Sequence, residues 1–437
     1  MINWRALLVF SLFIPQVSFG AVSLWQAGEW KLLAGGFAQL DYLHDTHQGY
    51  LETVGNAAIE SPDARLGQGD INQVSFRNSR VGFTVLPPGQ ELWKPKFYVE
   101  FDLLGNHAYR PFLGSSDVSY TDPSLRIRHL YVSAEYDGWM FLSGQTWTFF
   151  GWGPSYFLTT VSVPPGPGSI YARAQQFTAI KTLSADDHQT WRFGLSFGHA
   201  TQKGGGVPNI DAGVKYSHSG IQSGFASPSG DVSLEPFSLA LSGTMRKFGI
   251  GSVVATSEKM HKHQAFAMSL ATLLPVIPSR GKETANTLTL TAEYAAGTGI
   301  GDEYAGWSGN ISELPSAGLA DAEETYLRKG IGGFDAAGKF HLIQLHSWNT
   351  QLQYHLPWRT FLTGGHSELS AGNIAGLRPV FAGFTSYDKV SMNFINLFHD
   401  FTGSLRAAVE YAKFTTHYTS DIEQNDERYQ ATLFYRF

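Results

Sequence analysis

The last residues of the chain, YQATLFYRF (Tyr429–Phe437), decide the fold class because their side chains alternate. In an extended strand, successive side chains point to opposite faces. One face is apolar throughout and carries Tyr429, Ala431, Leu433, Tyr435 and Phe437. The other carries Gln430, Thr432 and Arg436, with Phe434 as the exception. An apolar face at a chain end gains nothing from water, so we expect it to meet lipid, with Tyr435 and Phe437 at the membrane interface.

The same alternation recurs through the chain, for example in KFYVEFDL (96–103), WRFGLSFG (191–198) and TLTLTAEY (287–294). Most of these segments approach the 9–11 residues that a tilted strand needs to cross the hydrocarbon of a membrane. Sixteen candidate strands follow, at about 31–43, 73–86, 93–104, 124–136, 139–148, 171–183, 189–199, 209–218, 236–247, 263–275, 286–296, 340–355, 358–368, 388–399, 404–416 and 428–437.

The connections alternate between short turns and long polar stretches, the long ones being 44–72, 105–123, 149–170, 297–339, 369–387 and 417–427. Short turns at one end and long loops at the other are typical of outer-membrane barrels. We therefore predict an all-β fold, an antiparallel transmembrane barrel of about sixteen strands, with both termini at the periplasmic end. The alternative, a secreted sandwich or propeller, is disfavoured because the strands are long and show no blade repeat. One link, 219–235, is long where a short turn is expected, and we predict a periplasmic insertion there.

The N-terminus has the pattern of a secretory signal peptide. MINWR is basic, ALLVFSLFI (Ala6–Ile14) is apolar but too short to span a bilayer, and small Ser18 and Gly20 precede Ala21. We predict a signal peptide at 1–20 and a single outer-membrane barrel domain at 21–437. The alternative is an uncleaved anchor. The chain has no cysteine, and its formal net charge of −6 disfavours a nucleic-acid partner.

SLRIRHLYVSAEYDGWMFLSGQTWTFF (124–150) resembles the DcaP-like family of bacterial outer-membrane porins. SFRNSRVGFTV (75–85), PPGPGSIYARAQQ (164–176) and the last hairpin agree in order and spacing. The resemblance implies a barrel of sixteen strands, usually trimeric, that passes small anions such as dicarboxylates. Some members carry a coiled coil before the barrel, whereas AVSLWQAGEWK here shows no heptads, which leaves trimerisation to the barrel walls.

The stretch 149–170, FFGWGPSYFLTTVSVPPGPGSI, follows the fifth predicted strand and is long enough to be functional. The resemblance implies that it folds into the barrel and narrows the pore. The alternative is an external loop packed on the rim. Its aromatic residues, with Trp147 before them, could guide sugars or aromatic solutes, or they could serve for loop packing or an interfacial girdle, and Tyr156 belongs to this set.

Basic residues cluster around this loop, and a mid-strand arginine should face the lumen because facing lipid costs about 2–4 kcal/mol. Alternation supports this for Lys96 and Arg192, and for Arg80 if Val81 faces outward. Arg126 and Arg128 share parity with apolar Leu130 and Val132, which suggests a bulge or a protein-facing wall. The predicted pore-lining set is Arg80, Lys96, Arg126, Arg128, Arg173, Arg192, Glu100, Asp102, Trp147 and Tyr156.

Two interpretations of these arginines remain open. They could hand anions along by bidentate pairing, or they could pair with barrel acids and only shape the field. The candidate acids are Asp41, Glu100, Asp102, Glu293 and Glu410.

The predicted function is passive diffusion of small hydrophilic solutes with a preference for anions. The alternatives are a porin for sugars or aromatic solutes, or a barrel enzyme or adhesin, for which no serine has an evident histidine partner. His341 and His346 point to opposite strand faces, and the pairs His44 with His47 and His261 with His263 lie in or near loops with no third ligand nearby in sequence. We therefore predict no metal site and no cofactor. The expected partners are outer-membrane lipid, further copies in a homotrimer and the barrel-assembly machinery, because a terminal Phe437 resembles its recognition signal.

Overall fold

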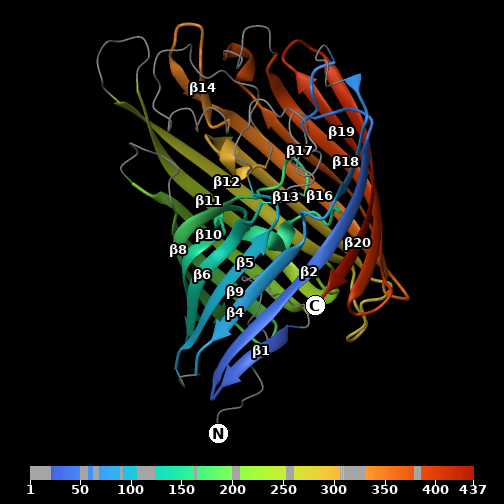
Figure 1. Ribbon diagram of the computed structural model, residues 1–437. Coiled ribbons are helices and arrows are strands. Elements are labelled where there is room, and N and C mark those ends of the chain that lie inside the picture. The colour runs from blue at the N-terminus through green and yellow to red at the C-terminus, as the bar shows by residue number, and fades with distance from the viewer. Residues whose placement is uncertain are drawn as a thin grey trace.

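In the computed structural model, sixteen antiparallel strands close into a barrel, which confirms the predicted fold class and strand count (Figure 1). The structure describes residues 21–437 except 50–57, 63–67, 89–91, 106–123, 162–164, 199–206, 252–259, 306, 308, 310–329 and 378–384. The predicted signal peptide therefore lies outside the described residues. Among the described residues, no helix is long and apolar enough to cross a membrane.

The barrel strands follow one another around the ring in chain order. They are β2 (Trp30–Asp45), β3 (Ile71–Ser75) with β4 (Arg80–Leu86), β5 (Lys94–Asp102), β6 (Arg126–Tyr136), β7 (Trp139–Trp147), β8 (Arg173–Ser184), β9 (Gln189–Gly198), β10 (Asn209–Phe225), β11 (Ser233–Gly251), β12 (Met260–Ile277), β13 (Leu288–Thr298), β16 (Gln344–Leu356), β17 (Thr360–Ala371), β18 (Tyr387–Asp400), β19 (Leu405–Tyr418) and β20 (Glu423–Arg436).

β1 (Val22–Ala27), β14 (Gly332–Phe334) and β15 (Phe340–Leu342) are not strands of the barrel ring. β3 and β4 both pair with β2, so they count as one barrel strand, and β1 pairs only with the start of β2. The large sheet has eighteen strands; leaving out β1 and counting β3 with β4 as one strand gives sixteen. β14 and β15 form a separate small hairpin.

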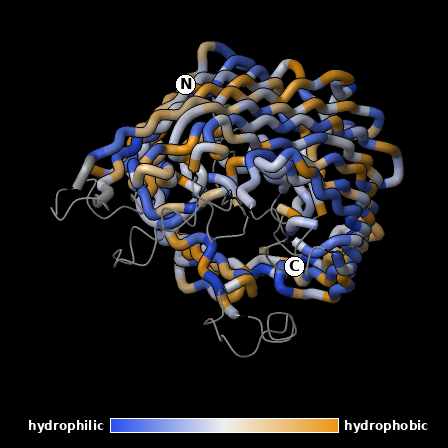
Figure 2. The backbone as a smooth tube through the Cα atoms, turned by 90° about the horizontal axis from the view of Figure 1, so that it is seen from above, coloured by the Kyte–Doolittle hydropathy of each residue, from blue (hydrophilic) through white to orange (hydrophobic). Residues whose placement is uncertain are grey.

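Alternation along the strands separates an apolar outer face from a filled interior. On β20, Leu433 and Tyr435 are 45% and 56% exposed, whereas Phe434 and Arg436 are 1% and 4% exposed. Phe434 points inward and packs with Phe37 and Phe398. Hydrophobic and hydrophilic residues likewise alternate along the tube when the barrel is viewed from above (Figure 2). The outer face can meet lipid because each strand turns its polar side chains to the lumen.

The first and last barrel strands close the ring. β2 pairs with β20 from Phe37 opposite Arg436 to Asp45 opposite Arg428. Beyond this ladder, the Gly36 N–H donates to the carbonyl of Phe437 at 2.9 Å, and the Phe437 N–H donates back at 3.0 Å. The terminal residue thus makes the last pair of backbone hydrogen bonds in the seam.

Two segments of chain lie inside the barrel. One is the predicted loop after β7, which begins with the short helix η3 (Phe150–Tyr156). The other is the tip of the β10–β11 hairpin, where the structure differs from the predicted insertion. Most of 219–235 is strand: β10 extends to Phe225, β11 begins at Ser233, and the two strands pair with each other there. The Gly, Ser and Pro content of this stretch hid the strands from sequence analysis.

We expect deletion of Phe437 to lower the yield of folded barrel more than it alters the channel. The deletion removes two backbone hydrogen bonds worth about 1 kcal/mol each at the closing seam and leaves the interior intact. The measurement is the fraction of outer-membrane protein with the gel mobility of folded barrel. Phe437→Tyr keeps both backbone bonds and is the control. Equal yields of the deletion and the control would contradict this role.

Candidate functional site

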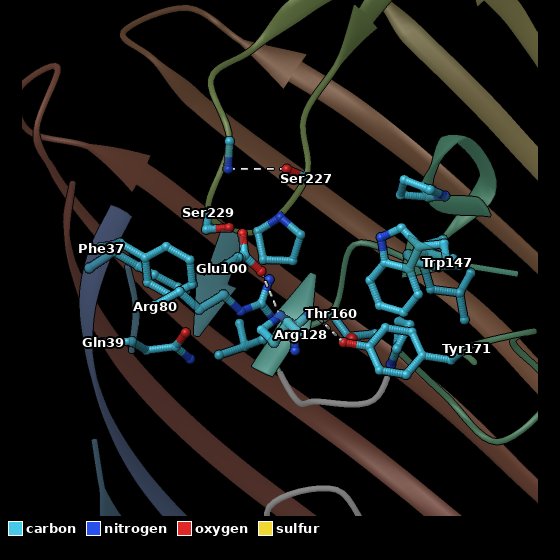
Figure 3. Close-up of a pocket in the computed structure, with 18 of the residues that line it drawn as sticks. Phe37, Gln39, Arg80, Glu100, Arg128, Trp147, Thr160, Tyr171, Ser227 and Ser229 are labelled. Atoms are coloured by element: carbon cyan, nitrogen blue, oxygen red, sulfur yellow. Dashed lines mark hydrogen bonds and ion pairs between the residues drawn. The ribbon is translucent and has the colours of Figure 1, made fainter. Parts of the chain in front are cut away.

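A cavity of about 170 Å³ lies inside the barrel between the wall and the two internal segments (Figure 3). The wall side presents Arg80 from β4, Glu100 from β5 and Arg128 from β6. The wall also contributes Phe37 and Gln39 from β2, Trp147 from β7 and Phe434 from β20, and the two internal segments border the cavity as well. The loop after β7 contributes Pro154, Phe157, Leu158, Thr160, Val161 and Pro165, and the β10–β11 tip contributes Ser227, Pro228, Ser229 and Gly230.

The loop after β7 is fastened to the inner wall by side chains and backbone. Phe149 occupies a recess at Gly194 on β9, where any Cβ would lie 2.1 Å from its ring. The indole N–H of Trp152 donates to the Leu241 carbonyl at 3.0 Å. Further along, the Thr159 N–H donates to Oε1 of Gln351 and the Val161 N–H donates to Oε2 of Glu410, both at 2.7 Å. The loop therefore lies against β9–β19 and leaves the arginine-bearing wall facing the cavity.

A bulge in β6 brings two neighbouring side chains to the lumen. In the β5–β6 ladder, Glu100 pairs with His129 and Phe101 with Ile127, so Arg128 has no opposite residue. Arg128 and His129 are consequently both buried, while Ile127 is 46% exposed on the outside. A bulge of this kind re-aims one side chain and explains why parity was ambiguous here.

Two of the arginines are bound to carboxylates. Nε and Nη2 of Arg126 donate to the two oxygens of Asp102 at 2.9 and 2.6 Å. Arg128 donates to Glu100 at 2.7 Å and to Asp102 at 2.8 Å. Arg128 and Asp102 have fully buried side chains, so the pairing compensates for the loss of hydration. For these two arginines, the ion-pairing interpretation describes what the structure contains.

Arg80 and Arg173 differ from them. Among the described residues, neither lies within 4.0 Å of a carboxylate oxygen, and Nε of Arg80 and Nη1 of Arg173 are buried without a hydrogen-bond acceptor. Aromatic rings are their neighbours: Phe37 lies 5.4 Å from the Arg80 guanidinium and Trp147 lies 4.8 Å from that of Arg173. Four arginines against two carboxylates, 4 − 2, leave two positive charges in this group.

Tyr171 sits among these guanidinium groups, at the end of the loop. Nη2 of Arg128 lies 3.5 Å from its hydroxyl, and the Tyr171 N–H donates to the carbonyl of Glu303 at 2.7 Å. Burial alone raises the pKa of Tyr171, but Arg128, Arg80 and Arg173 together outweigh burial and lower the pKa to about 7. The phenol therefore loses its proton near neutral pH.

The other predicted lining residues lie in different places. Trp147 borders the cavity, whereas Arg173, next to Trp147, and Arg126, bound to Asp102, are not among the residues that border it. Lys96 is held away from it, with Nζ 5.9 and 5.7 Å from the rings of Tyr98 and Tyr131. Arg192 is buried on β9 opposite Lys215. Tyr156 does not border the cavity: it is the last residue of η3, and its buried hydroxyl lies 3.0 Å from Oγ of Ser238 on β11.

Of the candidate acids outside the arginine group, Asp41 and Glu410 bind neutral donors. Asp41 accepts hydrogen bonds from Gln39, Asn78, Gln430 and Thr432. Glu410 accepts from Asn396 at 2.9 Å as well as from Val161.

Sequence analysis missed Tyr171 and the hairpin tip as parts of the site. Tyr171 shares strand parity with Arg173, which was the available signal, whereas nothing local indicated that 227–230 would reach the cavity.

No protein-family model and no curated protein matches the sequence. Solved structures match in fold. The outer-membrane channel DcaP of Acinetobacter baumannii is 14% identical, with 95% of this chain and 100% of that chain covered and a TM-score of 0.63. The anion-selective porin from Comamonas acidovorans is 10% identical, with 94% and 100% covered and a TM-score of 0.53. OprB of Pseudomonas putida is 9% identical, with 92% and 94% covered and a TM-score of 0.53. The chain therefore has the fold of the outer-membrane porins, in line with the predicted resemblance.

We expect Asp102→Asn to destabilise the barrel strongly. It removes the charge that Arg126 and Arg128 share, and breaking a buried ion pair costs about 3–5 kcal/mol. Asp137→Asn is the matched control, because Asp137 is 82% exposed and 3.9 Å from Lys181, a surface pair worth about 0–1 kcal/mol. The measurement is the free energy of unfolding of purified protein in detergent or lipid. Equal losses for both variants would show that the buried pair adds nothing.

Proposed function

We propose that this chain is a porin of the bacterial outer membrane that passes small solutes by diffusion and prefers anions. The observation that carries the proposal is a pair of guanidinium groups that have no carboxylate partner among the described residues. Arg80 borders the cavity, and the guanidinium of Arg173 lies 4.8 Å from Trp147 of the cavity lining. A solute anion can supply the acceptors that both of them lack. Residues 149–170 include no charged side chain, so the loop adds no charge of its own beside these two arginines.

The bound arginines have a different part. Glu100 and Asp102 form ion pairs with Arg126 and Arg128. The two carboxylates therefore do not neutralise Arg80 and Arg173 by direct contact. A guanidinium that already holds a carboxylate is a weak binder of a second one, and a free one binds strongly. Conduction requires sites strong enough to admit an ion and weak enough to release it, which a mixture of free and committed arginines provides.

The proposal includes the route to the membrane and the assembly. Residues 1–20 act as an export signal, the 21–437 domain inserts into the outer membrane, and the seam strand with Phe437 is read by the barrel-assembly machinery. Tyr435 and Phe437 lie at the lipid interface; both are exposed on the outer face. The DcaP-like resemblance supports a homotrimer.

Passage of sugars along aromatic rings has less support. Trp147 is one of the aromatic residues that border the cavity, and the guanidinium groups of Arg173 and Arg128 lie 4.8 and 5.5 Å from its ring. A ring engaged with cations offers less surface to a sugar. A passive channel without catalytic activity remains the proposal.

The test is ion selectivity after Arg80→Gln and Arg173→Gln. We expect each substitution to lower the anion-to-cation permeability ratio about fivefold, the factor that corresponds to the roughly 1 kcal/mol between charges 4 Å apart in water. The measurement is the reversal potential of single channels in a potassium chloride gradient.

Lys282→Gln is the matched control for this experiment, because Lys282 lies exposed in the β12–β13 turn and the substitution removes the same charge. A wild-type channel that prefers cations, or equal shifts in all three variants, would overturn the proposal. A purified barrel that does not conduct at all would overturn the porin function itself.

We also expect anion preference to weaken as pH rises from about 6 to 8. Below a pKa of about 7 the Tyr171 phenol is neutral and the group carries two positive charges. Above this pKa, the negative charge of the phenolate reduces the net charge of the group from two positive charges to 2 − 1 = 1. Reversal potentials measured at several pH values should show this change, and Tyr171→Phe should remove most of it.

Two nearby groups require controls. Burial raises the pKa of Glu303, which would also become negative as pH rises, so Glu303→Gln separates its share. His129 lies 3.8 Å from Glu100 and borders the cavity; His129→Gln tests it in the same way. A pH dependence that is unchanged in Tyr171→Phe would contradict the role of Tyr171.

A further inference from the structure

The β10–β11 hairpin leaves the barrel wall and enters the lumen. The ladder between β9 and β10 ends at His218, and the ladder between β11 and β12 ends at Ser238. Beyond these points β10 and β11 pair only with each other, from Gln222 opposite Pro236 to Phe225 opposite Ser233. Residues 219–221 have no opposite residue in β11, and an insertion of this kind bends a two-stranded ribbon.

The hairpin crosses to the far side of the ring. The Ala226 N–H donates to Oε1 of Gln353 on β16 at 2.7 Å, and Nη1 of Arg406 on β19 reaches the tip carbonyls. Arg436 on β20 contacts Asp231 at 3.2 Å. β10 and β20 are the eighth and sixteenth strands of a sixteen-strand ring, so the hairpin joins opposite walls.

Arg406 binds the backbone carbonyls at the far end of the hairpin. Nη1 of Arg406 donates to the carbonyls of Ser227, Pro228 and Gly230 at 3.1, 2.8 and 2.8 Å. Two bonds of 2.7 and 2.8 Å from the same guanidinium to Asp400 fix its orientation. Arg406 is fully buried, so its charge is compensated by Asp400 and is unavailable to solutes.

The hairpin also supports the loop after β7. The Thr159 hydroxyl donates to the Ala226 carbonyl at 2.9 Å. Val161 from the loop packs with Ala226 and with Phe361 and Phe398 of the wall, and Val232 of the hairpin packs against this cluster. The two internal segments thus form one packed body along the wall.

The tip of the hairpin borders the same cavity as Arg80. Ser227, Pro228, Ser229 and Gly230 border the same space as Arg80, and Figure 3 shows Ser229 on the Arg80 and Glu100 side. We propose that the β10–β11 hairpin is a second constriction, at the barrel end that carries the termini, and that it limits the channel to compact anions. The cavity of about 170 Å³ is smaller than the roughly 300–1,000 Å³ typical of pockets for drug-sized ligands.

This inference rests on the proposed porin function, and its test separates the two. The chain has no cysteine, so Ser229→Cys introduces a single reactive thiol at the tip. We expect modification by the anionic reagent 2-sulfonatoethyl methanethiosulfonate to reduce single-channel current at least about twofold, because it adds bulk and negative charge at a narrow point. Ser404→Cys, in the exposed β18–β19 turn outside the lumen, should react without a change in current.

A second variant replaces residues 226–232 with Asn-Gly, the two-residue turn suited to the Phe225–Ser233 pair. We expect it to raise the conductance about twofold and to admit larger organic anions. If this variant does not fold, the thiol experiment decides alone.

Mass spectrometry reports whether each thiol has been modified. If the wild-type channel conducts, two results overturn the inference. In one, Ser229→Cys does not react although Ser404→Cys does; in the other, Ser229→Cys reacts without any loss of current. A wild-type protein that forms no channel overturns the porin function instead.

Discussion

The structure depends on the rule that no backbone N–H or carbonyl can be left unpaired in hydrocarbon. A sheet that obeys it must have no edges, so β20 has to return to β2, and the Gly36–Phe437 hydrogen bonds complete that seam. Closure divides every strand into an outer and an inner face, and alternation then places apolar side chains outside and polar ones inside. Sixteen strands enclose a lumen wider than wall side chains can fill, and in this chain the loop after β7 and the β10–β11 hairpin occupy part of it.

The contents of the lumen follow from the cost of burying charge. Asp102 and Glu100 can be buried because Arg126 and Arg128 hold them, and Asp400 is buried because Arg406 does. The described part of 149–170 has no charged residue, and the hairpin brings Asp231, which is paired with Arg436, and Glu235 into the lumen. Within the group of four arginines and two carboxylates, the charge left over therefore belongs to the wall, at Arg80 and Arg173. Under the proposed function, packing and selectivity have the same origin: the paired charges hold the structure together, and the unpaired guanidinium groups attract the solute.

Period-two alternation is a local property, which is why the strands, their number and the closing role of Tyr429–Phe437 were predictable. Parity gives the face of a residue but not its height in the barrel, so Lys96 and Arg192 were grouped with a cavity that they do not border. Arg128 was ambiguous because its bulge is defined by the partner strand β5. The path of the hairpin was unpredictable for a similar reason: its Gly, Ser and Pro residues are those of a loop, and Arg406, which seats it, lies about 180 residues away.

The central claim is that the cavity between Arg80 and the internal segments, with Arg173 next to its lining residue Trp147, attracts anions. The most direct measurement is anomalous diffraction from crystals of the protein soaked in bromide and, separately, in rubidium. The account predicts a bromide peak in the cavity, within contact distance of Arg80, and no rubidium peak there. A rubidium peak in the cavity, or bromide bound elsewhere in the lumen while the cavity stays empty, would contradict it.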